Sequence, residues 1–234
     1  TSLTTTLEIQ PKRILIFLLG CFVFLLLMNF ASVWMKFTWG LDRFQGAARL
    51  FHFDEENNVP SFFSALCLFV SSLLLLQISL LRKKQSAAYL AWLGLSLIFC
   101  FLSVDEVAMF HERLVGPLDQ ILDTSGYLRF AWVIPYGLAT LILAVVYLRF
   151  LVRLPGKTRT LFIVAGILFI SGALGMEMIS ANYFDHHGGK TLAYDLMTTL
   201  EESLEMLGVF TFIYALLAYL GNEFPSAGVI IRKA

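Results

Sequence analysis

Charged residues are scarce in this sequence. Asp, Glu, Lys and Arg together make up 15% of the 234 residues, whereas hydrophobic residues make up 58%, and the mean hydropathy is +0.77. A soluble domain normally carries about 25% charged residues. This composition excludes an ordinary soluble domain and indicates an integral membrane protein.

Cysteine is rare, and several well-known motifs are absent. Cys21, Cys67 and Cys100 lie inside apolar runs without C-x-x-C spacing, which excludes a disulfide framework and a thiolate metal site. The sequence has no Walker loop, no G-x-S-x-G elbow, no H-E-x-x-H motif and no C-x-x-C-H haem motif. The expected outer side carries no basic patch, which argues against a nucleic-acid partner.

Long apolar runs are abundant. A membrane-spanning helix needs about 20 apolar residues at a rise of about 1.5 Å per residue. Six runs reach this length, near residues 14–36, 61–81, 86–113, 130–152, 160–182 and 193–221. The segments between them are too short for a separate soluble domain. We therefore expect an all-α polytopic membrane protein in which residues 1–234 form one domain, a bundle of six transmembrane helices.

Basic residues are distributed unevenly between the two sides of the membrane. With six spans, 11 of the 17 Lys and Arg residues fall on one side, which is the cytoplasmic side by the positive-inside rule. We therefore expect a protein of the cell (inner) membrane with both termini in the cytoplasm. The outer side carries 15 of the 17 Asp and Glu residues. Because acidic residues contribute little to orientation, this excess calls for a functional explanation.

Several of these acidic residues lie inside predicted spans. At the end of span three, Asp105 and Glu112 are seven residues apart, close to two helical turns, so on one continuous helix they would share a face. His111 would lie to one side of Glu112, and Glu106 would point elsewhere.

Spans five and six add further carboxylates. Span six has Asp195 and Glu202 at the same seven-residue spacing, with Glu201 and Glu205 close to Glu202 around the helix. Span five contributes Glu177 about two turns before its outer end. Separate elements thus deliver acidic groups to the same half of the membrane.

These acidic side chains need a counter-charge. A charge in the hydrocarbon layer costs about 2.5–3.5 kcal/mol on insertion scales, and such residues usually mark a site or a pathway. The outer halves of spans five and six contain no Lys or Arg, and Lys36 and Arg43 are expected in the first outer loop. The carboxylates must therefore be protonated, paired with a more distant basic residue, or bound to a metal ion.

Three explanations stay open: a structural network of salt bridges or protonated acids, a bound metal ion, and a transported cation or proton. Chains of Asp, Glu and His form relays in membrane pumps. Transport is disfavoured because the cytoplasmic halves of the spans lack acidic residues. A path that stops at the membrane midplane is a pocket.

A bound divalent metal ion is the most specific of the three explanations. Carboxylates on facing helices with an imidazole resemble the way helical bundles hold di-iron or di-manganese centres, although the Glu-x-x-His motif of those proteins is absent. Oxygen ligands favour Fe, Mn, Mg or Ca, and an imidazole also admits Zn, so the sequence does not distinguish these metals. The predicted ligands are Asp105, His111, Glu112, Glu177, Glu202 and Glu205.

Three other histidines have no assigned role. His186 and His187 lie in the Gly-flanked segment FDHHGG, and His52 precedes the acidic run DEE. Each could bind a metal ion or move protons near neutral pH. Histidines in such segments more often belong to a mobile polar turn than to a functional site.

The sequence therefore favours a membrane protein with a carboxylate-rich, divalent-metal site in the extracytoplasmic half of the bundle. If the protein is an enzyme, the metal would activate water or polarise a substrate oxygen, with Asp105 and Glu202 as catalytic residues. The expected substrate or partner is membrane lipid or another hydrophobic molecule. The alternatives are a non-catalytic subunit of a larger membrane complex or homo-oligomer, and a cation or proton transporter.

Overall fold

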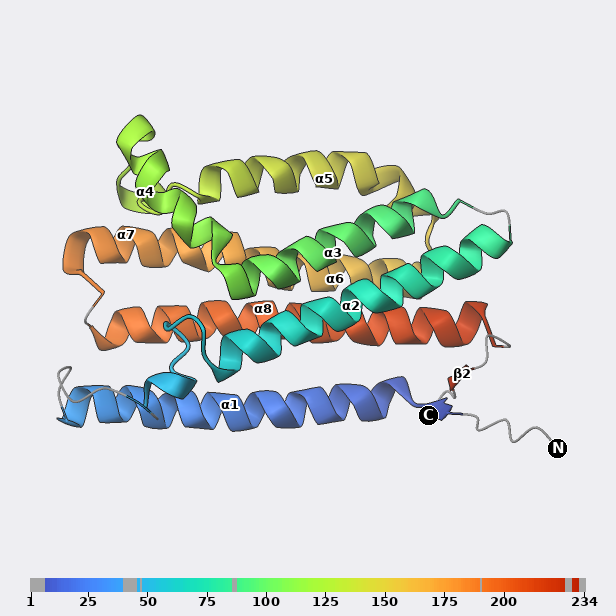
Figure 1. The fold of residues 1–234 in the computed structure, drawn as a ribbon, viewed down its shortest axis with the longest axis horizontal. Coiled ribbons are helices and arrows are strands. Elements are labelled where there is room, and N and C mark those ends of the chain that lie inside the picture. The colour runs from blue at the N-terminus through green and yellow to red at the C-terminus, as the bar shows by residue number, and fades with distance from the viewer. Residues whose placement is uncertain are drawn as a thin grey trace.

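Six helices in the described part of the chain are long and apolar enough to cross a membrane. The computed structural model describes residues 7–39, 46, 48–85, 88–189, 191–225 and 229–231. The six spans are α1 (Pro11–Trp39), α2 (Val59–Lys84), α3 (Leu90–Ala108), α5 (Val133–Arg153), the segment Gly156–His187 and α8 (Leu192–Glu223). They run along one another in a bundle (Figure 1). The expected all-α bundle of six membrane helices is confirmed.

The remaining elements are short. The fifth span consists of α6 (Gly156–Ile170), a π-helical turn η4 (Ser171–Met176) and α7 (Glu177–His187). Outside the spans lie η2 (Arg49–Phe51), α4 (Phe110–Leu122) and η3 (Gly126–Leu128). Strands β1 (Leu7–Ile9) and β2 (Val229–Ile231) pair in parallel, with Leu7 opposite Val229. This pairing places the two ends of the described chain at the same end of the bundle (Figure 1).

The third span ends earlier than the hydropathy pattern predicts. Helix α3 stops at Ala108, because Met109 adopts a left-handed conformation with φ 56°, and α4 starts at Phe110. The expectation that Asp105 and Glu112 share a face of one continuous helix is therefore wrong. Asp105 lies near the end of α3, whereas His111 and Glu112 lie in the first turn of a different helix.

Local sequence explains where α2 begins. The Asn58 side chain accepts a hydrogen bond from the Ser61 backbone N–H at 3.1 Å, and the Ser61 hydroxyl accepts one from the Asn58 backbone N–H at 3.4 Å. This is a capping box with Pro60 in the first turn, where proline costs no helical hydrogen bond. The start of α2 fixes the preceding acidic loop, because Asn58 Nδ2 also donates to the His52 carbonyl at 2.6 Å.

Helix α8 lies at the centre of the packing. Its buried residues contribute to both hydrophobic clusters of the described chain, one with α1 and α2 and the other with α2, α3 and α6. The second cluster is aromatic at the end of the bundle near Phe224: the ring of Trp92 lies 4.8 Å from that of Tyr219, and Phe162 lies 4.7 Å from Phe212. That end of the bundle is therefore filled with apolar side chains.

Two glycines let the fifth span approach α8 closely. A Cβ atom on Gly208 would lie 2.7 Å from the Phe169 backbone nitrogen. A Cβ atom on Gly172, in the π-helical turn, would lie 2.7 Å from both the Glu201 carbonyl oxygen and Glu205 Cγ. Only glycine fits at such backbone distances, so η4 is pressed against the acidic turn of α8.

Candidate functional site

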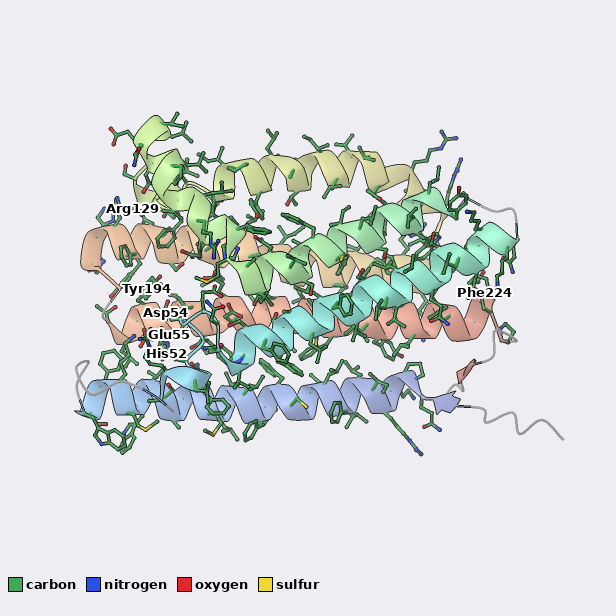
Figure 2. The ribbon with its side chains drawn as sticks, in the orientation of Figure 1. His52, Asp54, Glu55, Arg129, Tyr194 and Phe224 are labelled. Carbon is green, nitrogen blue, oxygen red and sulfur yellow. The ribbon has the colours of Figure 1, made fainter. Side chains whose placement is uncertain are left out.

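A buried ion pair joins α1 to the start of α8. Lys36 Nζ lies 2.8 Å from Asp195 Oδ1, and the two side chains are 8% and 0% exposed. His52 Nε2 lies 3.4 Å from the other oxygen of the same carboxylate. Lys36, expected in the first outer loop, is thus a buried residue in the last turn of α1. Figure 2 shows His52, Asp54, Glu55 and Tyr194 gathered at this end, opposite Phe224.

Asp105 organises the start of α4. Its Oδ1 accepts the His111 backbone N–H at 3.2 Å, and its Oδ2 accepts the His111 Nδ1–H at 3.2 Å and the Tyr136 hydroxyl at 3.0 Å. Burial lowers the pKa of His111, but the hydrogen bond and charge of Asp105, with Glu56 and Glu112, outweigh it and raise the pKa to about 9. His111 is therefore a cation at neutral pH, and its direct partner is Asp105.

Glu177 lies next to this pair. The ring of His111 lies 4.9 Å from that of Trp132, whose Nε1–H donates to Glu177 Oε1 at 3.1 Å. The carboxyl groups of Glu177 and Glu201 lie within hydrogen-bonding reach of each other. Ser180 donates to Glu201 Oε2 at 3.5 Å. A chain of polar contacts thus runs from α3 through α4 and α5 to α7 and α8.

Four more glutamates lie within electrostatic range of one another. The negative charges of Glu106 and Glu56 act on both Glu202 and Glu205, and Glu56 also acts on Glu106. The charge of Glu177 acts on Glu56 as well as on this pair of α8 residues. We call these residues the inner carboxylates: Glu56, Glu106, Glu177, Glu201, Glu202 and Glu205.

The ion pairs observed between described basic and acidic residues do not involve the inner carboxylates. Among the described residues, ion pairs within 4 Å join Lys36 to Asp195, Arg49 to Glu55, Arg82 to Glu223 and Arg129 to Asp185, and none of these four acids belongs to this set. The same part of the chain contains no group of three or more His, Cys, Asp or Glu side chains that could hold a metal ion as they stand. Lys190 and Arg43 lie outside the described residues.

Glu56 and Asp54 show the effect of this environment outside the spans. Burial raises the pKa of Glu56; the nearby His111 opposes the rise, and Glu112, Asp105 and Glu177 add to it. The surrounding protein also raises the pKa of Asp54, to about 7, against the opposing charge of Lys36, although Asp54 itself is solvent-exposed. Glu56 Oε2 is buried and has no hydrogen-bond partner among the described residues. A buried acidic oxygen without a partner is costly, so it requires a proton or a cation.

The structure divides the six predicted ligands into two groups. Asp105 and His111 contact each other directly, and Glu112 is exposed on α4. Glu177, Glu202 and Glu205 belong to the inner carboxylates.

Sequence reasoning missed Glu56, Glu106 and Glu201 as members of the site. Glu106 points away from Asp105 around α3, so it lies within electrostatic range of Glu202 and Glu205 while Asp105 contacts His111. Trp132 and Tyr136 were missed because nothing in their local sequence shows which acid they contact.

His186 and His187 belong to a separate surface. They line a cavity of about 380 Å³ together with Tyr127, Asn182 and Tyr183. At 100° per residue, His186 lies on the face of α7 opposite Glu177. His187 lies about 80° from Glu177 around the helix but about 15 Å further along it. The histidine pair is therefore separate from Glu177, whereas His52 contacts Asp195.

The comparison with protein families decides the affiliation of the chain. Residues 15–220 match the model described as "Domain of unknown function (DUF8692)". The chain belongs to this DUF8692 family. The match includes four spans entirely, all but the first residues of α1 and the last residues of α8, and every residue of the site described above. No curated protein and no solved structure matches the chain. The description of the DUF8692 family states no activity.

Proposed function

We propose that the inner carboxylates form a cluster that binds one divalent metal ion. The central ligands are Glu56, Glu106, Glu202 and Glu205, which come from the loop before α2, from α3 and from α8. Glu177 lies beside them and is joined to the cluster through Glu201. The flanking residues of the proposed site are Asp105, His111 and Glu112.

The observation that carries this proposal is that none of the ion pairs seen among the described residues involves an inner carboxylate. Several ionised carboxylates cannot share a small space within a membrane bundle without protons or a cation. The buried Oε2 atom of Glu56 has no hydrogen-bond partner among the described residues. His111 lies within electrostatic range of Glu56, Glu106 and Glu177, but Asp105 already engages it.

The donor set suits a hard divalent cation. Carboxylate oxygens are the preferred ligands of Mg²⁺, Ca²⁺ and Mn²⁺, and they also bind Fe²⁺. His111 would admit Zn²⁺ or iron only after it loses a proton, because a metal-bound imidazole is neutral. Binding requires the glutamate side chains to rotate toward a common point.

The opposite end of the bundle supports a pocket and not a pathway. There the space between α2, α3, α6 and α8 is occupied by buried Trp92, Phe162, Phe212 and Tyr219. An ion leaving the inner carboxylates in that direction would meet an apolar, aromatic core without acidic ligands. Transport across the whole membrane is therefore not the function we propose.

Elemental analysis tests metal binding. The purified protein should contain about one divalent metal ion per chain, and added metal should raise the thermal unfolding temperature of metal-depleted protein. The double variant Glu202→Gln/Glu205→Gln should lose both effects. Glu55→Gln is the matched control, because Glu55 lies at the same end of the bundle but pairs with Arg49. A metal-free protein that no divalent ion stabilises would contradict the proposal.

We further propose that this metal site is catalytic and acts on a membrane lipid or another hydrophobic substrate. A bound metal ion would supply Lewis acidity to a substrate oxygen or to water. Asp105 and His111 form a hydrogen-bonded acid–base pair beside the cluster, which suits proton transfer. Glu202 is the proposed catalytic carboxylate within it.

Lipid turnover in proteoliposomes tests the catalytic part. Protein loaded with metal would be reconstituted in a total polar lipid extract, and lipid composition would be followed by mass spectrometry. Asp105→Asn should abolish the change in composition while keeping the bound metal. Unchanged lipids with the wild-type, metal-loaded protein would instead favour a non-catalytic subunit of a larger complex.

A further inference from the structure

Helix α4 has an apolar face that is solvent-exposed in the described part of the chain. None of its residues is buried. Phe110, Leu114 and Ile121 lie within about 40° of arc around the helix, and their side chains are 40%, 37% and 76% exposed. Glu112 and Gly116 lie on the opposite side. An amphipathic helix with this pattern is typical of the boundary between water and lipid.

Connectivity places α4 at that boundary. It follows α3 and precedes α5, two helices that are long and apolar enough to span the membrane. It turns away from the direction of α3 and lies at the edge of the bundle (Figure 1). The ring of Phe110 lies 6.4 Å from that of Phe101, which is itself 48% exposed on α3. The apolar face of α4 therefore continues the outward-facing apolar surface of a membrane span.

The same helix is tied to the proposed site through its first turn. Met109 provides no side-chain cap, and its left-handed conformation separates α4 from α3. The Asp105 carboxylate takes the place of the missing cap, since it accepts the otherwise unpaired N–H of His111. A shift of α4 would therefore change the contact between His111 and Asp105.

We infer that α4 is an interfacial helix whose apolar face inserts into the lipid headgroup–acyl boundary and thereby holds His111 against Asp105. The occupant of this face is the bilayer itself, in the same leaflet as the inner carboxylates. His111 acts here as a positioning contact and not as a metal ligand. The inference concerns lipid contact, so it can hold or fail independently of metal binding.

A fluorescent probe on α4 tests the insertion. In a background with Cys21, Cys67 and Cys100 replaced, Ile121→Cys and Gly116→Cys would be labelled with an environment-sensitive fluorophore and reconstituted in phosphatidylcholine nanodiscs. Gly116 is a suitable control because a Cβ atom there meets nothing within 4 Å. Lipid carrying a nitroxide on the upper acyl chain should quench the probe at position 121 at least several-fold more than at 116. Equal quenching at both positions would overturn the inference.

Hydrogen exchange tests the link to Asp105. Ile121→Glu places a charge on the apolar face, and Gly116→Glu places the same charge on the polar face. In nanodiscs, deuterium uptake of the peptide containing His111 should rise in Ile121→Glu and stay unchanged in Gly116→Glu. Asp105→Asn should raise it as well, because the cap is weakened. Unchanged uptake in Ile121→Glu would show that lipid insertion does not hold His111 in place.

Discussion

Asp195 and Glu205 lie on the same helix, about three turns apart, and have opposite electrostatic surroundings. Asp195 is fully buried and is neutralised by Lys36 of α1. Glu205 is surrounded by the charges of Glu106, Glu177 and Glu56. A structural salt-bridge network therefore explains the first carboxylate, and it does not explain the second.

Removing Lys36 should destabilise the protein strongly. Lys36→Met would leave the Asp195 charge buried without its cation, which typically costs about 3–5 kcal/mol. The free energy of unfolding, measured by denaturant titration in detergent, should fall by that amount. The double variant Lys36→Met/Asp195→Asn should recover a large part of the loss. A single variant as stable as the wild type would show that the pair is not needed for the fold.

Residue identity alone does not reveal these pairings. Lys36 and Asp195 are separated by 159 positions, and nothing near either residue in the sequence names its partner. The concentration of acidic residues on one side was predictable, because the order of the spans along the sequence assigns each charged residue to one side of the membrane. Which acid faces which depends on the rotation of each helix in the bundle.

The π-helical turn η4 is the element that shapes the proposed site most directly. Extra residues in a helical turn shift the faces before and after it, and such turns are frequent at functional sites. Here η4 directly precedes Glu177, and its Gly172 lies against the backbone and side chain of the acidic turn of α8. The element thus brings α7 and α8 together where their carboxylates meet.

Adding one methyl group to this turn should disturb the site. Gly172→Ala would place a Cβ atom 2.7 Å from the Glu201 carbonyl oxygen, and such overpacking typically costs about 1–3 kcal/mol. Gly166→Ala on the same span is the matched control, because its Cβ atom would meet nothing within 4 Å. Thermal unfolding should shift downward for the first variant only. Equal midpoints would show that η4 can move away from α8 freely.

The break at Met109 shows why one element was not predicted. The run 86–113 is apolar enough to read as one helix, and methionine is a good helix former. The left-handed conformation is supported by contacts from distant residues: Asn57 Nδ2 donates to Met109 Sδ at 2.9 Å, and Asp105 holds His111. Such tertiary contacts override local helix propensity. The hydropathy pattern therefore predicted that this span exists, but it did not predict that the helix ends at Ala108.

At the scale of the whole molecule, the bundle has a polar acidic end and an apolar aromatic end. Six spans were predictable because a bilayer demands long apolar helices with satisfied backbone hydrogen bonds. Both ends of the described chain lie at the apolar end (Figure 1). We propose that this end faces the cytoplasm, as the basic loops indicate, and that the acidic end faces outward.

Labelling of intact cells tests this orientation. Ser125 lies between α4 and α5 at the acidic end, and Gln85 lies between α2 and α3 at the other end. Each would be replaced by cysteine in the background without the native cysteines. A membrane-impermeant maleimide should label position 125 in intact cells, and position 85 only after permeabilisation. The reverse pattern would invert the proposed topology.

Anomalous diffraction from crystals soaked in Mn²⁺ tests the central claim most directly, because it locates the metal and the ligands together. The account predicts one anomalous peak within bonding distance of carboxylate oxygens from Glu56, Glu106, Glu202 and Glu205. Glu202→Gln/Glu205→Gln crystals treated identically should lack it. A peak only at His186 and His187, or none among the inner carboxylates, would contradict the account.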